Sequence, residues 1–98
     1  MFNIPKSINI AGIKIDVSIL KDKLLNDGNF GTYDGRQSEI TIADKMSDGQ
    51  VKSTLIHEII EAINHLYNIE LEHHKICILE VALNQFFESN NIDWIKRK

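Results

Sequence analysis

Hydrophobic residues repeat with one period in the first half of the chain and with another in the second half. Up to about residue 43, apolar side chains alternate with polar or small ones, as in "SINIAGIKIDVSIL" and "SEITIA", which is the period of a half-buried β-strand. From about residue 50 they recur every three or four positions, which is the period of an amphipathic helix. Strands followed by helices predict a small α+β domain: a β-hairpin or meander sheet, then an antiparallel two-helix hairpin.

Turn residues give the predicted strands their approximate ends. Strands are expected within residues 8–43, with a turn or bulge at Ala11-Gly12 and a turn at Asp27-Gly28. Asp34-Gly35 has the composition of a hairpin tip, and it predicts flanking strands at Phe30–Tyr33 and Ser38–Ala43.

Capping residues do the same for the two helices. Ser47 and Asp48 offer an N-cap to a helix over about residues 50–67. A short break precedes a second helix over about residues 72–89, and Trp94 is expected to pack back onto the core. With 98 residues, the chain is expected to form one domain, residues 1–98.

Composition excludes several classes of function. The net charge is −3 and charges of both signs are interspersed, whereas general nucleic-acid binding needs a basic surface. Neither an apolar run long enough to span a bilayer nor a signal-peptide core is present. The single cysteine cannot form an internal disulfide. These features predict a cytoplasmic protein with no nucleic-acid or membrane partner.

The most informative motif is "IHEIIEAINH", residues 56–65. It begins like the helical zinc site H-E-x-x-H, but Glu61 stands where the second histidine would be. At 100° per residue, His57, Glu61 and His65 share one ridge of the helix, and Glu58 lies on the same polar side. A polar ridge on an amphipathic helix also fits ordinary solvent exposure, so the motif alone leaves both interpretations open.

The second helix adds an acidic residue among apolar ones. Glu80 shares a face with Ile76 and Phe87, and His73 lies two turns earlier on the same ridge. A partly covered carboxylate needs a partner, a metal or a raised pKa. When the two helices fold back on each other, His57 comes opposite Glu80, and Glu61 falls between Glu80 and His73.

Two ligand sets remain open for a metal at this place. His57, Glu61 and Glu80 alone would bind zinc, but such a set favours manganese or iron more than the parent motif does. With His73 as a second imidazole, the usual mixture of nitrogen and oxygen ligands is restored. Glu58 would then be the general base. His65 could polarise a carbonyl, or it could be a surface histidine.

Three stretches of this sequence resemble a known family. They are "TLIHEIIEAIN" (54–64), "LEHHKI" (71–76) and "LEVALNQF" (79–86), preceded by a hairpin like "YDGRQSEITIA". Over residues 8–90 the chain is similar to small zincin-like proteins encoded by phages and prophages. The resemblance implies a minimal zincin fold in which an edge strand, here Ser38–Ala43, lies beside the motif helix. It also implies a shared polar signature: His57, Glu58, Glu61, His73 and Glu80.

Three functions fit these observations. The first is a metal-dependent hydrolase, a peptidase in particular, acting on an extended segment placed beside Ser38–Ala43. The second is a non-catalytic zincin-like module that binds or inhibits a host or phage protein in the host cytoplasm. The third is a small α+β domain whose polar helix residues only face water. The sequence leaves the oligomeric state open.

Overall fold

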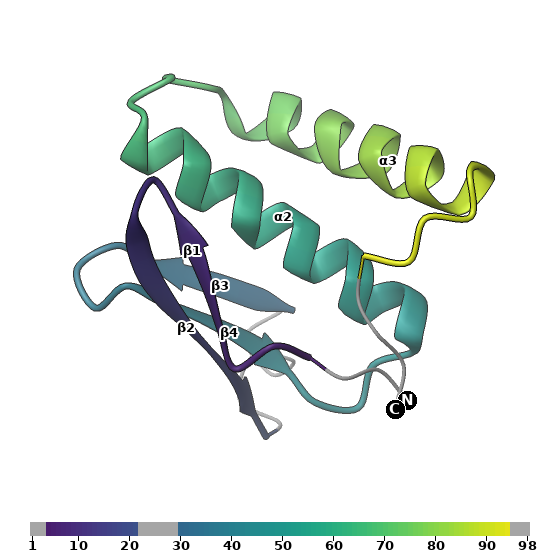
Figure 1. The fold of residues 1–98 in the computed structure, drawn as a ribbon, viewed down its shortest axis with the longest axis horizontal. Helices are drawn as coiled ribbons and strands as arrows, with labels where there is room; N and C mark the ends of the chain where they lie inside the picture. The colour runs from purple at the N-terminus through teal and green to yellow at the C-terminus, as the bar shows by residue number, and fades with distance from the viewer. Residues whose placement is uncertain (1–3, 22–29, 95–98) are drawn as a thin grey trace.

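The computed structural model describes residues 4–21 and 30–94 of the chain. Within them, strands come first and helices follow, which confirms the predicted α+β class (Figure 1). The elements are β1 (Ser7–Ile10), β2 (Ile13–Leu20), β3 (Gly31–Asp34), β4 (Glu39–Ala43), α2 (Asp48–Leu66) and α3 (His73–Ser89). Helix α2 crosses one face of the sheet, and α3 lies against α2 and runs antiparallel to it. The predicted turn at Asp27-Gly28 lies outside the described residues.

The sheet is built from two hairpins rather than from a meander. Its strand order is β1-β2-β4-β3, in which β1–β2 and β3–β4 are antiparallel and β2–β4 is parallel. Ala11 and Gly12 both have positive φ angles, 54° and 76°, as a two-residue turn between right-twisted strands requires. In the second hairpin, Asp34 Oδ1 accepts hydrogen bonds from the backbone N–H groups of Arg36 and Gln37, so this tip forms where it was predicted.

The sequence-based prediction of the edge strand was wrong. Segment Ser38–Ala43 forms β4, which lies inside the sheet between β2 and β3, and the edge strands are β1 and β3. Ile40 and Ile42 of β4 are fully buried. Alternation of apolar and polar residues reports which face of a strand is covered, but it does not report how many strands pair with it.

Helix α2 is covered from two sides by two apolar clusters. On the sheet side, Leu55 and Ala62 join the core cluster with Ile15, Ile40 and Ile42. On the other side, Ile56 and Ile60 of α2 meet Ile76 of α3. Trp94 packs against both clusters, which confirms its expected return to the core.

Local hydrogen bonds fix the ends of the two helices. Ser47 caps α2 as predicted: its hydroxyl accepts from Gln50 N–H, and the Gln50 side chain accepts from Ser47 N–H. In the connection, the Asn64 side chain bonds both backbone groups of Leu71, which holds the start of α3 beside the end of α2. No helix in residues 4–21 and 30–94 is long and apolar enough to cross a membrane.

Strand β3 approaches α2 closely because one of its residues has no side chain. A Cβ atom at Gly31 would lie 2.6 Å from Thr54 Cγ2 and 3.3 Å from Glu58 Cγ. Thr54 and Glu58 are buried, although the sequence places both on the polar side of the helix. The sequence left open whether this side faces solvent, because the strand that covers these two residues belongs to a different part of the chain.

This close approach predicts that Gly31→Ala destabilises the fold. The added methyl group must displace the Thr54 side chain or the strand, at about 1–3 kcal/mol of the free energy of unfolding. Gly49→Ala is the matched control, since a Cβ atom at that helical position meets no atom within 4 Å. Chemical denaturation of both variants measures the difference; equal stabilities would contradict the described distance between β3 and α2.

Candidate metal centre

His57 lies between two carboxylates that come from two helices. Its Nδ1 is 2.8 Å from Glu80 Oε1 on α3, and its Nε2 is 3.5 Å from Glu61 Oε2 on α2. The His57 and Glu80 side chains are only 16% and 20% exposed. An ionised carboxylate only accepts hydrogen bonds, so the short contact places a proton on Nδ1. In the neutral imidazole, the lone pair on Nε2 then faces Glu61.

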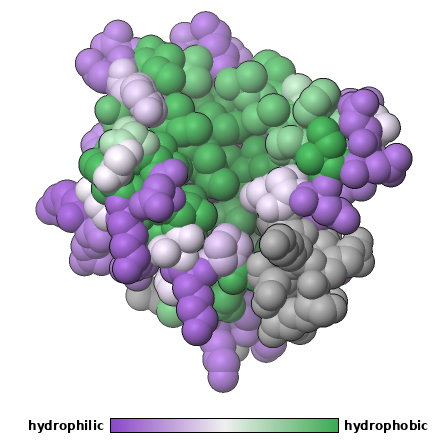
Figure 2. All heavy atoms as spheres, in the orientation of Figure 1, coloured by the Kyte–Doolittle hydropathy of each residue, from purple (hydrophilic) through white to green (hydrophobic). Residues whose placement is uncertain are grey.

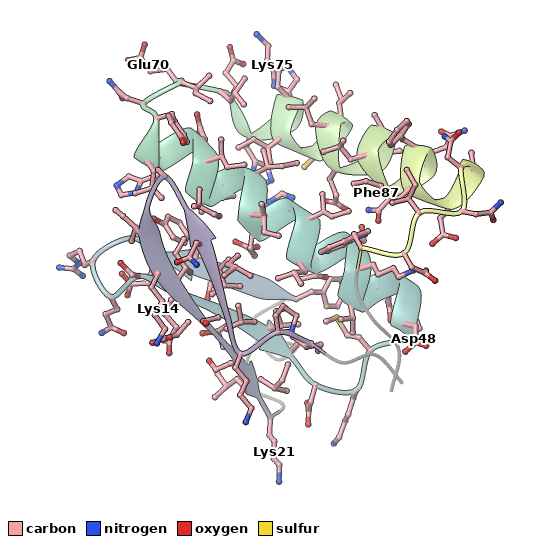
Figure 3. All side chains as sticks on the ribbon, in the orientation of Figure 1. Lys14, Lys21, Asp48, Glu70, Lys75 and Phe87 are labelled. Atoms are coloured by element: carbon pink, nitrogen blue, oxygen red, sulfur yellow. The ribbon has the colours of Figure 1, made fainter. Side chains whose placement is uncertain are left out.

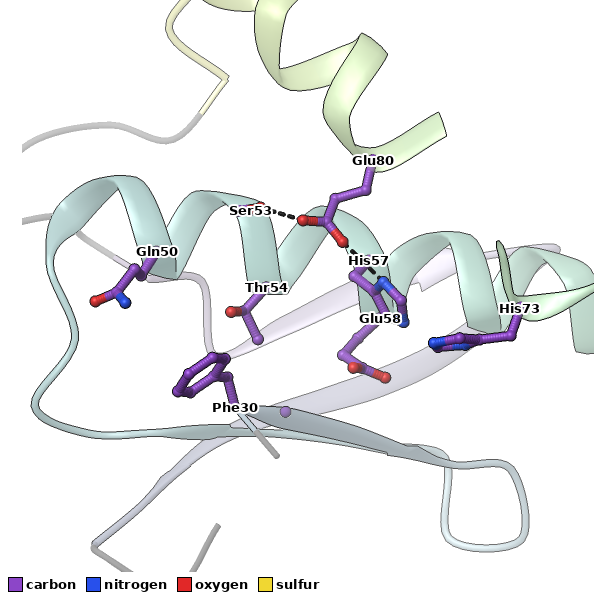
Figure 4. Close-up of a pocket in the computed structure, with 9 residues that line it drawn as sticks. Phe30, Gln50, Ser53, Thr54, His57, Glu58, His73 and Glu80 are labelled. Atoms are coloured by element: carbon purple, nitrogen blue, oxygen red, sulfur yellow. Dashed lines mark hydrogen bonds and ion pairs between the residues drawn. The ribbon is translucent and has the colours of Figure 1, made fainter. Parts of the chain in front are cut away.

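Glu80 is held by a second partner on α2. The hydroxyl of Ser53 donates a hydrogen bond to Glu80 Oε2, while the other carboxylate oxygen accepts a hydrogen bond from His57 Nδ1 (Figure 4). No role was predicted for Ser53 from the sequence. Its position could have suggested one, because Ser53 lies one turn before His57 on the ridge that continues to Glu61 and His65.

The first residue of α3 completes a group of potential ligands. His73 Nδ1 is 3.6 Å from Glu61 Oε2, and its ring meets the edge of the His57 ring at a centroid distance of 5.2 Å. One ligand atom from each of His57, Glu61 and His73 lies within 4.8 Å of the others. Among the residues that the structure describes, this is the group whose geometry could hold a metal ion. His73 remains 71% exposed, so the group opens to solvent.

The predicted meeting of the two helices is therefore observed. Glu80 contacts His57 across the hairpin, and Glu61 contacts both histidines. Of the two ligand sets that the sequence left open, the one containing His73 is brought together. Glu80 contacts the opposite nitrogen of His57 and lies outside the converging group.

Glu58 extends from the same turn of α2 toward the sheet. It lines a pocket of about 360 Å³ together with His57, His73 and Glu80. The walls on the strand side include Phe30 and Gly31, and Figure 4 shows the Glu58 carboxylate below the imidazole of His57. The buried carboxylate of Glu58 and the two histidines of the candidate metal group thus line one pocket.

The surroundings of Glu58 disfavour its charged form. The pKa of Glu58 is raised from the ordinary 4.5 to about 7, and burial is the largest cause. His57 acts in the opposite direction, while the neighbouring charges of Glu61 and Glu80 add to the effect of burial on this pKa. A carboxyl group with a pKa near 7 exchanges protons in the range where a general base works best.

His65 lies one turn beyond Glu61 and has a different partner. Its Nδ1 is 3.0 Å from the hydroxyl of Tyr33 on β3, and a Cβ atom at Gly35 would be 2.6 Å from its ring. Glu61, His65 and Tyr33 line a second hollow beside the candidate metal centre. His65 was predicted from the sequence as a candidate site residue, but Tyr33 was not. The contact between β3 and the end of α2 joins distant segments, so no local sequence pattern indicates it.

Two further residues with potential ligand atoms lie at the margin. His74 is exposed and pairs with Glu72 at 3.3 Å, as expected for a surface histidine. Cys77 is half-buried, and its Sγ is 3.5 Å from His73 Nε2. The thiol thus contacts the nitrogen of His73 that faces away from Glu61.

The raised pKa of Glu58 predicts how stability depends on pH in the protein without metal. The folded state holds the proton of Glu58 more tightly than the unfolded state, so the free energy of unfolding falls as pH rises from about 4.5 to about 7. Glu58→Gln removes this loss and should be more stable than the parent at pH 8, by a difference on the order of 2 kcal/mol. At pH 4 the difference should vanish.

Urea denaturation at several pH values in the presence of a chelator measures this effect. Glu70→Gln is the control, because Glu70 is an exposed loop residue. A Glu58→Gln profile parallel to that of the parent between pH 4 and pH 8 would show that Glu58 is not desolvated.

In comparisons with protein-family models, with curated proteins and with solved structures, nothing matches the chain. The resemblance to zincin-like proteins therefore stays a prediction, and function is argued from the geometry of the pocket.

Proposed function

We propose that the protein binds one divalent metal ion through His57, Glu61 and His73 and hydrolyses a peptide with its help. One observation carries the proposal: three potential ligand atoms lie within 4.8 Å of one another, and two of the three residues, His57 and His73, line the pocket that also holds the buried carboxylate of Glu58. Ligand groups and a candidate base within one pocket are what metal-assisted hydrolysis requires.

The chemistry of the donors supports zinc as the first choice. Two imidazoles and one carboxylate make up the protein ligands of many hydrolytic zinc sites, which keep another position for water or substrate. Manganese and iron are the alternatives, because neither imidazole nor carboxylate excludes them. The exposure of His73 leaves one side of the group accessible to a substrate.

Glu80 and Ser53 would act on the metal site through His57. Glu80 fixes the proton on Nδ1 and so directs the Nε2 lone pair toward Glu61. Ser53 in turn holds the Glu80 carboxylate. Partners of this kind orient a histidine ligand and make it more basic, which gives Glu80 a positioning role in the proposal.

Glu58 is the general base of the proposed reaction. A bound divalent ion polarises the substrate carbonyl and makes a water molecule more acidic. The Glu58 carboxylate would accept a proton from that water and then deliver it to the leaving amine. Its burial keeps competing solvent away, and the desolvation that raises its pKa in the metal-free protein makes the carboxylate a better proton acceptor.

The free edge of β3 is the proposed binding place for the substrate. Gly31 of this strand lines the pocket of Glu58, and Tyr33 of the same strand lines the hollow beside Glu61. An extended peptide that pairs with the backbone of β3 would therefore run along both hollows. The proposed docking strand is therefore β3, whereas the strand expected from the sequence was Ser38–Ala43.

A second function has its own support. Each imidazole of the cluster already has a carboxylate partner without any ion: His57 contacts Glu80 and Glu61, and His73 contacts Glu61. A cluster closed in this way fits a non-catalytic zincin-like module that engages a host or phage protein. With this function we also propose a phage origin and a cytoplasmic location. The cytoplasmic location rests on the lone cysteine.

Metal titration by calorimetry distinguishes the two functions. The purified chain should bind about one zinc ion, and His57→Ala should abolish binding because it removes the central ligand. Glu80→Gln should weaken binding by about 10–100-fold, since it removes the partner of His57 and leaves the three ligands in place. His74→Ala is the matched control. Absence of binding, with a melting temperature insensitive to chelator, supports the closed cluster instead.

Hydrolysis of a peptide library by the zinc-loaded protein tests the catalytic half of the proposal. Glu58→Gln should lower the rate by at least about 100-fold, because it removes the proton acceptor, while zinc affinity stays within a few-fold of the parent. Full activity in Glu58→Gln, or equal loss in a Glu88→Gln control on the exposed last turn of α3, would remove Glu58 from the mechanism.

A further inference from the structure

The pocket of Glu58 continues toward the start of α2. Beyond Glu58, the far end of the pocket is lined by Gln50, Ser53 and Thr54 of the helix, and by Phe30 on the strand side (Figure 4). Figure 2 shows hydrophobic side chains gathered in the upper part of the molecule, where Figure 1 places α3. The far end of the pocket differs from that surface, because three of its four residues carry an amide or a hydroxyl group.

The helix cap fixes the orientation of the Gln50 amide. Its Oε1 accepts hydrogen bonds from the backbone N–H and the hydroxyl of Ser47, at 3.0 and 3.3 Å. The N–H groups of Nε2 are therefore turned away from the cap, and Figure 4 shows this nitrogen on the side of Phe30. The far end of the pocket thus presents a hydrogen-bond donor whose direction is set by the capping box.

Two hydroxyl groups of the wall supply acceptors. Ser53 donates its hydrogen to Glu80, and Thr54 directs its hydrogen toward Met46 Sδ at 3.9 Å. A hydroxyl oxygen whose hydrogen is already committed still has lone pairs that accept hydrogen bonds. The far end of the pocket combines these two acceptors with the amide donor and with the aromatic ring of Phe30.

The charges around the pocket disfavour an ionised ligand side chain. Glu58 and Glu80 line the same pocket, so a third carboxylate placed there is repelled. Among the described residues that line the pocket there is no Lys or Arg, and Figure 3 shows Lys21 and Lys75 projecting away from the body of the molecule. A cationic side chain would meet the N–H groups of Gln50, which are donors like its own. These surroundings favour a neutral polar side chain.

The free edge of β3 directs one side chain of a docked peptide toward this place. The carbonyl of Phe30 accepts from Ala43 N–H on β4 at 2.8 Å, so by alternation the backbone groups of Gly31 face the free edge. A Cβ atom at Gly31 would point at Thr54 and Glu58. Opposite residues of paired strands place their side chains on the same face of the sheet. A peptide residue opposite Gly31 therefore points its side chain toward α2, beside the bond on which Glu58 would act.

We propose, on the basis of the function proposed above, that the far end of the pocket is a subsite for a carboxamide side chain of the docked peptide, glutamine in particular. The side-chain carbonyl accepts from Gln50 Nε2, the NH₂ group donates to the hydroxyl oxygen of Ser53 or Thr54, and the amide plane packs on the ring of Phe30. An apolar side chain of similar size would leave these polar groups without partners.

Hydrolysis of peptides that differ at one position tests this substrate class. With the zinc-loaded protein, kcat/KM for a peptide with glutamine beside the cleaved bond should exceed that of its glutamate and leucine counterparts by at least about tenfold. Gln50→Glu keeps an acceptor for the Ser47 cap but replaces the donor by a carboxylate, so it should abolish the preference for glutamine and favour lysine. Gln85→Glu makes the same change on the exposed side of α3 and should leave the preference unchanged.

Binding without hydrolysis separates this subsite from the hydrolase itself. N-acetylglutamine methylamide, added to the metal-free protein, should shift the NMR signals of the Phe30 ring and the Gln50 amide, whereas N-acetylglutamate methylamide should not. Gln50→Glu, with its fold checked by circular dichroism, should lose the response.

The two failures have different signatures. Peptide hydrolysis without a preference for glutamine, or with a preference that survives Gln50→Glu, would overturn the subsite and leave the hydrolase in place. A glutamine response that depends on Gln50, in a protein that neither binds zinc nor cleaves peptides, would retain the subsite and overturn the hydrolase. A parent that prefers lysine or arginine beside the cleaved bond would overturn the carboxamide assignment as well.

Discussion

The contact between His57 and Glu80 determines both the position of α3 and the geometry of the pocket. The two atoms are 2.8 Å apart and largely shielded from solvent, and the contact adds a polar link between the helices to the small apolar cluster of Ile56, Ile60 and Ile76. A shielded carboxylate requires a hydrogen-bonding partner, so removing either residue leaves the other poorly satisfied. The same contact fixes which nitrogen of His57 faces Glu61 and His73. The same contact therefore constrains both the packing of α3 on α2 and the orientation of His57 as a ligand.

The burial of Glu58 in the pocket depends on β3, the strand on the other side of α2. Gly31 lets β3 approach until Glu58 is enclosed, while α3 covers the turn that carries His57. One helix thus presents two carboxylates to very different surroundings. Glu58 lies toward the sheet with a pKa near 7, and Glu61 lies toward the open side with two imidazole neighbours. Pairs of acidic groups in unlike environments are a common basis for dividing binding and proton transfer between residues.

The sequence predicted the features that depend on local spacing. The Ser47 cap, the turn at Asp34 and the meeting of His57 with Glu80 follow from rules that act within a turn or across a short hairpin. The parallel pairing of β2 with β4 could not be predicted in this way, because strand pairing joins distant segments and alternation leaves the neighbour undefined. The burial of Glu58 was missed for the same reason, since it depends on a glycine 27 positions earlier in the chain. The pairing of Tyr33 with His65 is again a contact between distant residues.

Helix α3 has more apolar surface than the fold uses. Its inner side needs only Ile76, Phe87 and the polar residues of the pocket, yet Ile78, Val81 and Phe86 are apolar as well. Exposed apolar side chains add nothing to the stability of a monomer. His73 is the first residue of a helix that lacks a side-chain cap, so this turn is prone to fray. Holding His73 in place as a ligand would therefore cost conformational entropy, which lowers the affinity of the proposed metal site.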